Sequence, residues 1–216
     1  MFDKNVAQGV FITFEGGEGA GKSTQVKILA NQLEEHGFKV LQTREPGGSL
    51  GAEDIRELLV TGAPDRWSAS TETLLNFAAR DDHLRTTIRP ALQSGSVVIC
   101  DRFMDSTRAY QGSAGGAQKD LIEHLEHSII GTTVPDLTFI FDIDPDIGLS
   151  RTKSRNHGNE DRFENKPESF HQTLRQAFLD IANNEPERCV VIDASKSQSD
   201  VASSIWTIIE NRLRIK

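Results

Sequence analysis

A glycine-rich segment near the N-terminus carries the residue types that bind phosphate chains. Residues 16–24 read Gly-Gly-Glu-Gly-Ala-Gly-Lys-Ser-Thr, which fits the pattern G-x-x-x-x-G-K-[S/T]. Its glycines lack Cβ atoms, so backbone N–H groups can close around phosphate oxygens. Lys22 adds positive charge for the outer phosphates, and the Ser23 hydroxyl can reach a Mg²⁺ ion. The pattern predicts a nucleoside triphosphate site made of Gly16, Gly17, Glu18, Gly19, Ala20, Gly21, Lys22, Ser23 and Thr24.

The elements on either side of this loop are those that a phosphate site requires. The apolar run 10–14 predicts a strand before the loop, and residues 23–33 predict a helix after it. The N-terminus of such a helix favours anions. A glycine-rich turn that matches the pattern by chance would not require this order of strand, loop and helix.

The rest of the chain repeats the alternation of strand and helix. Strand-like apolar runs cover 10–14, 39–43, 96–100, 137–142 and 189–193. Amphipathic stretches cover 24–36, 52–59, 71–93, 119–130, 167–183 and 200–214. Gly37 is placed to end the first helix, and Pro90 should kink or divide the third. This order predicts an α/β fold with a five-stranded parallel sheet covered by helices on both faces. We expect one domain over residues 1–216.

Charged and hydroxyl residues follow four of the five predicted strands. They are Glu15, then Thr43, Arg44 and Glu45, then Asp101 and Arg102, then Asp142 and Asp144. Ligands of parallel sheets bind at the carboxyl ends of the strands. Because arginine stands at two of these ends, we expect a second anionic ligand opposite the phosphate loop.

Composition excludes several classes of protein. The net charge of −8 and the pI near 5.3 argue against a general nucleic-acid binder. Cys100 and Cys189 lie in apolar runs without C-x-x-C spacing, which favours buried free thiols in a reducing compartment. No signal peptide and no apolar run of about 18 residues is apparent. We therefore expect a soluble cytoplasmic protein with no membrane or nucleic-acid partner.

Other phosphate-loop proteins fit the chain less well than a kinase does. Residues 165–168 read Asn-Lys-Pro-Glu, which departs from the guanine-reading N-K-x-D motif at its fourth position and follows no predicted strand. Motor-type ATPases need far more chain. A kinase for a small molecule or a nucleotide fits the length and explains the arginines. A kinase for another nucleotide or a deoxynucleoside, and a nucleotide-binding protein without turnover, are the alternatives.

The remaining motifs resemble one family. They are Thr43-Arg44-Glu45-Pro46-Gly47-Gly48, Asp101-Arg102-Phe103, Ala109-Tyr110-Gln111-Gly112, Pro135-Asp136-Leu137-Thr138 and Asp161-Arg162-Phe163-Glu164. In this order they are similar to the signature set of thymidylate kinases, from about Val10 to Asp193. The resemblance implies the fold of nucleoside monophosphate kinases and a reaction in which ATP, with Mg²⁺, phosphorylates dTMP to dTDP. It also implies a homodimer that packs helices near 52–59 and 71–91.

The resemblance implies how the two phosphate chains are held. Lys22 would hold the ATP phosphates, and Ser23 and Asp101 would support Mg²⁺. A structural ion pair of Asp101 with an arginine is the alternative. Arg44 and Arg102 match the arginines that clamp the dTMP phosphate, because a guanidinium binds two oxygens at once. Alternatively, one of them only ties the loop to Glu45.

The base and sugar would be read by a further group of residues. Arg80 matches the arginine that contacts thymine, and Thr107 and Gln111 match groups at the thymine rim. Phe77 is the expected stacking ring, although many family members have phenylalanine at the place of Asn76; core packing is the alternative for Phe77. Two further residues are expected near the sugar: Tyr110, which would favour deoxyribose unless it is a core residue, and Glu18, unless it is a solvent-facing loop residue.

Residues 151–162 match the lid that closes over ATP. They include four basic residues: Arg151, Lys153, Arg155 and Arg162. In this family the catalytic arginine comes from the phosphate loop or from the lid. The loop here has Gly19 and no arginine, so the lid would supply it, as in the bacterial form. Arg155 matches best by spacing, Arg151 is the other candidate, and a solvated basic loop without a catalytic role is the alternative.

Overall fold

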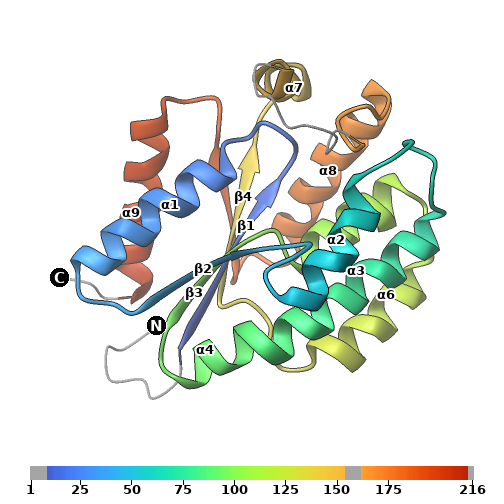
Figure 1. The fold of residues 1–216 in the computed structure, drawn as a ribbon. Coiled ribbons are helices and arrows are strands. Elements are labelled where there is room, and N and C mark those ends of the chain that lie inside the picture. The colour runs from blue at the N-terminus through green and yellow to red at the C-terminus, as the bar shows by residue number, and fades with distance from the viewer. Residues whose placement is uncertain (1–8, 154–161, 214–216) are drawn as a thin grey trace.

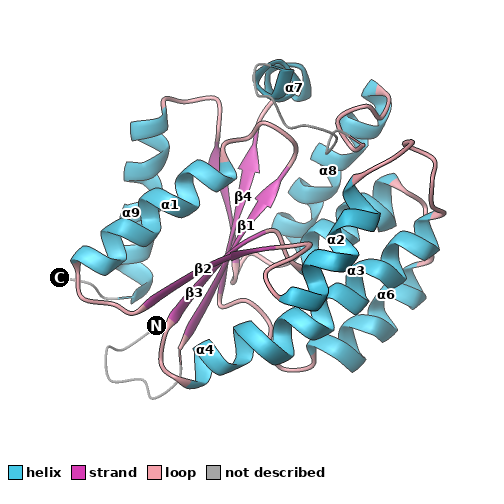
Figure 2. Cartoon of the chain, in the orientation of Figure 1, coloured by secondary structure: helices cyan, strands magenta, loops and turns pink. Residues whose placement is uncertain are grey.

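The computed structural model describes residues 9–153 and 162–213 and contains a five-stranded sheet. The strands are β1 (Val10–Gly16), β2 (Val40–Arg44), β3 (Val97–Asp101), β4 (Leu137–Asp142) and β5 (Cys189–Asp193). They are ordered β2-β3-β1-β4-β5, and every neighbouring pair is parallel. The predicted sheet is therefore confirmed, and each of its strands begins or ends within two residues of the predicted bounds (Figures 1 and 2).

Helices cover both faces of the sheet. Figure 1 shows α1 (Lys22–Glu35) and α9 (Gln198–Leu213) together on one face. The other face carries α2 (Leu50–Val60), α3 (Ala69–His83), α6 (Lys119–Leu125) and α8 (Glu168–Asn184). The central strands are buried on both sides, so their sequences are continuous apolar runs. Ile12 and Phe14 of β1 pack in the core cluster beneath α1 and α9, whereas Phe11 packs in a cluster with residues of α3.

The predicted helix over 71–93 is three consecutive segments. They are α3, a π-helical turn η1 (Leu84–Ile88) and α4 (Arg89–Gln93). Pro90 lies in the first turn of α4, where its missing N–H does no harm. Instead of a break at Pro90, the structure has the π-helical turn η1 before it, and Ile88 and Arg89 at the junction keep right-handed helical backbone angles. A second π-helical turn, η3 (Glu126–Ile130), completes the predicted helix over 119–130.

Three short helical segments were not predicted. They are α5 (Met104–Thr107), the π-helical η2 (Arg108–Ala114) and α7 (Pro145–Lys153). α5 and η2 follow β3 one after the other, and α7 follows β4. None of the three is long enough to show a clear amphipathic period. Their conformation depends on contacts with the sheet edge and with α8.

The carboxyl ends of three neighbouring strands meet at one edge of the sheet. Asp101 at the end of β3 pairs in register with Arg44 of β2 and with Phe14 of β1. The phosphate loop follows β1 at the same edge, and α7 lies beyond the end of β4 (Figure 1). Residues that follow different strands are thereby brought together, as parallel topology requires.

Within the described ranges, no helix combines the length and apolar character needed to cross a bilayer.

Candidate functional site: a phosphate loop between two cavities

Lys22 lies inside the phosphate loop that joins β1 to α1. Its Nζ donates hydrogen bonds to the carbonyl oxygens of Gly16 at 3.0 Å and Gly17 at 2.7 Å. Burial and the nearby charge of Arg102 lower the pKa of Lys22 to about 8, although carboxylates around it act in the opposite direction. The loop therefore encloses a cation at the N-terminus of α1, which is a suitable environment for phosphate oxygens.

Ser23 and Asp101 form a pair of oxygen ligands beside this loop. Ser23 Oγ donates a hydrogen bond to Asp101 Oδ2. Such hard oxygen donors fit Mg²⁺, which binds one or two protein oxygens and keeps other places for phosphate and water. The described residues include no cluster of three or more histidine, cysteine or acidic side chains that could hold a metal alone. The donor set thus suits a metal bound together with nucleotide.

A cavity of about 330 Å³ opens on one side of the loop. Its walls are Gly19, Ala20, Gly21, Thr24, Gln25, Arg151, Ala194, Lys196, Ser197, Gln198 and Val201. Arg151 Nη1 donates to the carbonyl oxygen of Ala194 at 3.2 Å. We call this the donor cavity. It includes one of the two candidate lid arginines, whereas Arg155 lies outside the described residues.

A second cavity, of about 160 Å³, lies on the other side of the loop. Its walls are Glu18, Glu45, Pro46, Arg56, Leu59, Val60, Asn76, Arg102, Ser106, Thr107, Tyr110, Gln111, Phe163 and Glu164. We call this the acceptor cavity. Five of the eight predicted substrate-binding residues line it: Glu18, Arg102, Thr107, Tyr110 and Gln111.

Arg102 connects the loop with the acceptor cavity. It has a φ of 71°, a conformation that few residues other than glycine adopt. Its Nη1 donates to the Gly16 carbonyl at 2.9 Å and to Ser106 Oγ at 3.2 Å. Its Nη2 lies 3.3 Å from Glu18 Oε1, and its guanidinium lies over the Tyr110 ring. A backbone conformation of this kind at a cavity indicates that the surrounding contacts hold the side chain in place.

Glu18 faces the acceptor cavity as an anion. Its Oε1 accepts a hydrogen bond from the Tyr110 hydroxyl at 2.6 Å. Burial opposes ionisation, but the charges of Arg102 and Lys22 outweigh it and lower the pKa of Glu18. Its Oε2 is buried without a hydrogen-bond partner among the described residues. Glu18 is therefore not a solvent-facing loop residue, and it has an acceptor to offer to a hydroxyl group.

Arg44 lies outside the wall of the acceptor cavity. Its side chain is 54% exposed and forms an ion pair with Glu53 at 3.0 Å. The expected alternative partner, Glu45, is instead buried: it accepts from Arg80 Nε at 2.7 Å and from His83 Nδ1 at 3.0 Å. Neighbouring residues of an extended segment point in opposite directions, so Arg44 and Glu45 have different surroundings.

The structure favours core packing for Phe77. Its ring is 1% exposed, and the guanidinium of Arg80 lies 4.8 Å from its centroid. Asn76 lines the acceptor cavity in its place. Consecutive residues of a helix differ by about 100° in direction, so the two cannot share one wall. The expectation that Phe77 stacks on a base is not supported by this geometry.

Arg80 lies behind the acceptor cavity with one hydrogen-bond donor unused. Its Nη2 donates to the Phe103 carbonyl at 3.0 Å and to Thr107 Oγ1 at 3.1 Å. Its Nη1 is buried without a hydrogen-bond partner in the part of the chain that the structure describes. Buried donors are usually satisfied, so an unpaired guanidinium nitrogen next to a cavity indicates an acceptor on the ligand.

Comparisons with known proteins identify the family of this chain. The family model described as thymidylate kinase matches residues 14–205. The chain is 55% identical to a thymidylate kinase of Caulobacter vibrioides, over 96% of this chain and 99% of the relative. For a thymidylate kinase of Magnetococcus marinus the identity is 53%, over 95% and 97% of the two chains.

The chain belongs to the thymidylate kinase family. A crystal structure of thymidylate kinase from Ehrlichia chaffeensis also matches, with a TM-score of 0.75 and 35% identity over 94% of this chain and 99% of that one. The nucleoside monophosphate kinase fold implied by the sequence is thereby confirmed, and the chain is a nucleoside monophosphate kinase.

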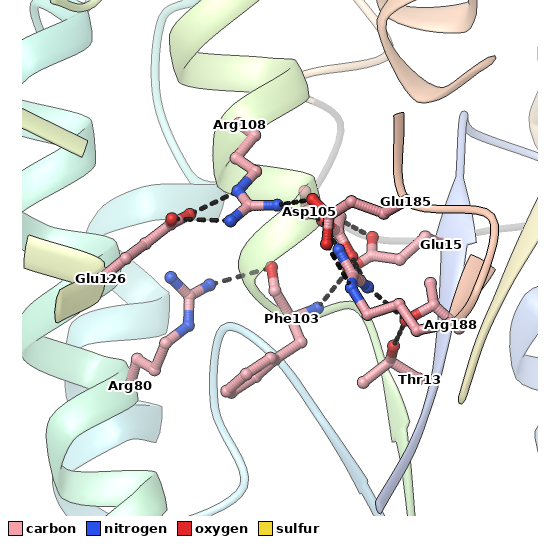
Figure 3. A network of polar contacts seen from close by, with 11 residues as sticks. Thr13, Glu15, Arg80, Phe103, Asp105, Arg108, Glu126, Glu185 and Arg188 are labelled. Carbon is pink, nitrogen blue, oxygen red and sulfur yellow. Dashed lines mark hydrogen bonds and ion pairs between the residues drawn. The ribbon is translucent and has the colours of Figure 1, made fainter. Parts of the chain in front are cut away.

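The prediction missed the buried support of this thymidylate kinase site. Asp105 is fully buried and receives two hydrogen bonds from Arg188, at 2.7 and 2.8 Å, and one from Arg108 at 3.2 Å (Figure 3). Glu15 accepts from the Phe103 N–H at 2.7 Å and from Ser106 Oγ at 2.6 Å. The only sequence signal was the position of each carboxylate within a few residues of a strand end.

The surroundings of Glu15 keep its carboxyl group partly protonated near neutral pH. Burial and repulsion from Asp105 raise its pKa to about 7, against its two hydrogen bonds and the charge of Arg102. Because Glu15 bonds both the backbone after Arg102 and Ser106, it holds the segment that positions Arg102.

Arg162 has a different place from the one expected of a lid residue. Its side chain is fully buried, and it donates hydrogen bonds to the carbonyl oxygens of Leu59, Ala63 and Pro64 and to Glu72. Arg162 is therefore a structural residue next to the acceptor cavity and contributes no mobile charge for ATP.

Proposed function

We propose that this ATP-dependent dTMP kinase binds ATP in the donor cavity and dTMP in the acceptor cavity, with transfer across the phosphate loop. One observation carries the proposal: Glu18 lines the acceptor cavity, whereas the next residue, Gly19, lines the donor cavity. Two phosphate chains on either side of this loop would meet end to end, as direct transfer of the γ-phosphoryl group requires. The product is dTDP. One kinase domain contains the whole site, and its proposed lid, residues 151–162, ends at the buried Arg162.

The cationic residues would divide between the two phosphate chains. Lys22 neutralises the outer phosphates of ATP, and Arg102 clamps the phosphate of dTMP. We keep Arg44 as a second clamp, because an exposed ion pair such as Arg44–Glu53 contributes about 0–1 kcal/mol and a phosphate can replace Glu53. Neutralisation by these fixed charges lowers the repulsion between the two anions before transfer.

Ser23 and Asp101 would hold Mg²⁺ together with the ATP phosphates. When bound, the ion neutralises phosphate charge and orients the transferring group. The chain's own contribution is the pair of oxygens beside Lys22.

The lid would supply the remaining positive charge. Arg151 lies in the donor cavity and supports the adenosine side of ATP through the segment near Ala194. Arg155 is proposed as the arginine that stabilises charge on the transferring group in the transition state. Arg151 is the alternative for this role.

We also propose that the enzyme works as a cytoplasmic homodimer. Leu58 of α2 and Leu74 of α3 are 40% and 52% exposed on two helices that pack against each other. Covering apolar side chains is the main contribution to association. Cys100 and Cys189 are buried free thiols, which suits a reducing compartment. Sedimentation of wild type and of Leu74→Lys tests the dimer: a monomeric wild type contradicts it.

A coupled assay of ADP release tests the reaction. The acceptors are dTMP, dUMP, dCMP, AMP and thymidine, each with Mg-ATP. We expect the largest kcat/KM for dTMP. A larger value for another acceptor indicates a kinase for that nucleotide or nucleoside, and nucleotide binding without turnover indicates a non-catalytic protein.

A further inference from the structure

Glu72 of α3 links the acceptor cavity to Arg162 without lining the cavity itself. Its side chain is 8% exposed. Its Oε1 accepts a hydrogen bond from Arg162 Nη2, and its Oε2 accepts one from Gln111 Nε2 at 3.0 Å. Both oxygens of one buried carboxylate are thus used, one by a guanidinium and the other by an amide.

Arg162 leaves Glu72 little freedom. Three further bonds join it to backbone carbonyls, at 2.9 Å for Ala63, 3.1 Å for Leu59 and 3.2 Å for Pro64. These carbonyls lie at the end of α2 and in the segment that follows, which makes a cradle of fixed acceptors around the guanidinium. Because a guanidinium only donates, the group opposite it in α3 must accept.

The carboxylate in turn decides the orientation of the Gln111 amide. A carboxylate paired with a guanidinium has no proton to donate, so only the NH₂ branch of an amide can bond to it. The Gln111 nitrogen must face Glu72, and the other branch, the oxygen Oε1, is the one that Gln111 can offer to the acceptor cavity. This orientation of the Gln111 amide follows from the charge of the Glu72 carboxylate, which can only accept a hydrogen bond.

We propose that Glu72, held by Arg162, is a specificity-determining positioning residue that makes the cavity select a base with an N–H donor beside a carbonyl acceptor. Thymine and uracil have this pattern at N3 and O4. Cytosine has the reverse pattern, an acceptor at N3 and an amino donor at C4. The inference rests on the proposed placement of the dTMP base in the acceptor cavity.

The unused donor of Arg80 extends the same pattern. Its Nη1 is buried and unpaired within the described residues, while Nε and Nη2 of the same guanidinium bond to Glu45 and Thr107 of the cavity wall. An acceptor from Gln111 and a donor from Arg80 match thymine at two positions and oppose cytosine at both. A site with buried polar groups of fixed direction rejects a mismatched ligand strongly, because those groups stay unpaired.

The variant Glu72→Gln tests the proposal. It keeps the shape of the side chain at position 72 and reverses the direction of its hydrogen bond with Gln111. Arg162 still requires an acceptor, so the oxygen of the new amide would face Arg162 and its NH₂ group would face Gln111. Gln111 must then turn its own oxygen to that NH₂ group and its nitrogen to the cavity. We expect the ratio of kcat/KM for dTMP to that for dCMP to fall at least tenfold, with the KM for ATP unchanged.

A merely structural role for Glu72 would lower kcat/KM for both acceptors by the same factor and leave the ratio as in wild type. That outcome overturns the proposal. The control is Glu123→Gln, which removes the same charge from an exposed ion pair with Lys119 on α6, and whose ratio should equal that of wild type.

A second variant, Gln111→Met, covers the case in which Glu72→Gln does not fold. It removes both amide atoms at nearly the same volume, and we expect the dTMP to dCMP ratio to fall. An unchanged ratio shows that the amide does not read the base and overturns the proposal. Wild-type enzyme that turns over dTMP no better than other acceptors would contradict the proposed function instead, so the two failures are distinguishable.

Discussion

Gly19 of the phosphate loop and Gly148 of α7 pack backbone against backbone. A Cβ atom on Gly19 would lie 1.9 Å from the Gly148 carbonyl oxygen, and one on Gly148 would lie 2.4 Å from the Glu18 carbonyl oxygen. Gly19 also has a φ of +67°. No side chain fits between the loop and α7, the helix that precedes the proposed lid. An arginine on the loop at this position is therefore excluded, and positive charge has to come from elsewhere.

We expect Gly19→Ala to separate α7 from the loop and to raise the KM for ATP at least tenfold. Steady-state kinetics and urea unfolding measure the two effects. The control is Gly95→Ala, because Gly95 has a similar φ of +76° but nothing within 4 Å of an added Cβ. Gly95→Ala should cost about 1–2 kcal/mol of stability through backbone strain and leave the KM for ATP unchanged. Equal effects of both variants on ATP would contradict the packing argument.

Arg102→Ala should remove dTMP binding and leave most ATP binding. Two charge-assisted hydrogen bonds to a phosphate contribute about 3–5 kcal/mol, so the Kd for dTMP should rise roughly 100-fold or more. ATP affinity should fall only slightly, through the lost bond to the Gly16 carbonyl. Titration calorimetry with dTMP and with a non-hydrolysable ATP analogue measures both. If ATP binding collapsed to the same extent, Arg102 would not be the acceptor clamp.

The two lid arginines should differ in the kinetic constant that they change. Arg155→Ala is expected to lower kcat by about 100-fold or more while changing either affinity much less, because the role we propose for its charge is mainly in the transition state. Arg151→Ala is expected mainly to raise the KM for ATP, because Arg151 lines the donor cavity and bonds to Ala194. An unchanged kcat in Arg155→Ala would move the catalytic role to Arg151 or to another residue.

Glu15 should make folding stability depend on pH. Its pKa in the folded protein is about 7 against an ordinary value of 4.5. Between these values the folded state binds more protons than the unfolded state, so stability falls as pH rises through this window. Relative to wild type, Glu15→Gln should gain about 3 kcal/mol in unfolding free energy from pH 4.5 to pH 7.5. Urea unfolding at several pH values measures the difference. A difference between the two proteins that does not change with pH would contradict it.

Asn76 and Phe77 should give opposite results although they are neighbours. Phe77→Leu is expected to lower the free energy of unfolding by about 1–2 kcal/mol and to change the KM for dTMP little, because the ring is in the core. Asn76→Ala should raise the KM for dTMP and change stability little, because Asn76 lines the acceptor cavity. Thermal unfolding and kinetics on both variants distinguish the roles. A raised KM only in Phe77→Leu would restore Phe77 as the base-stacking ring.

Local pattern was sufficient for the sheet and for the phosphate loop. Each strand is an apolar run, and the loop's glycines and Lys22 are consecutive, so the information lies within a few residues. The order of strands and helices then placed the polar strand ends at one edge. Pro90 indicated an irregularity in the third helix, because proline removes a backbone N–H donor from a helix interior, but the π-helical turn that precedes it came only from the structure.

Pairings between distant residues were decided only by the tertiary structure. Whether Arg44 or Glu45 faces inward depends on α2 and α3, which supply Glu53 and Arg80 as partners. The packing of α3 places Phe77 in a buried apolar cluster and Asn76 at the cavity wall. Glu72 had no sequence signal, because its partners Gln111 and Arg162 are 39 and 90 residues away.

The sequence by itself determined that this protein is a parallel α/β kinase with a phosphate loop, because each of these features depends on the types of a few consecutive residues. Only the tertiary structure decided which polar atoms remain free to meet a ligand. Which atoms remain free depends on which hydrogen-bonding groups already have partners from other elements. The Gln111 nitrogen, for example, already donates to Glu72.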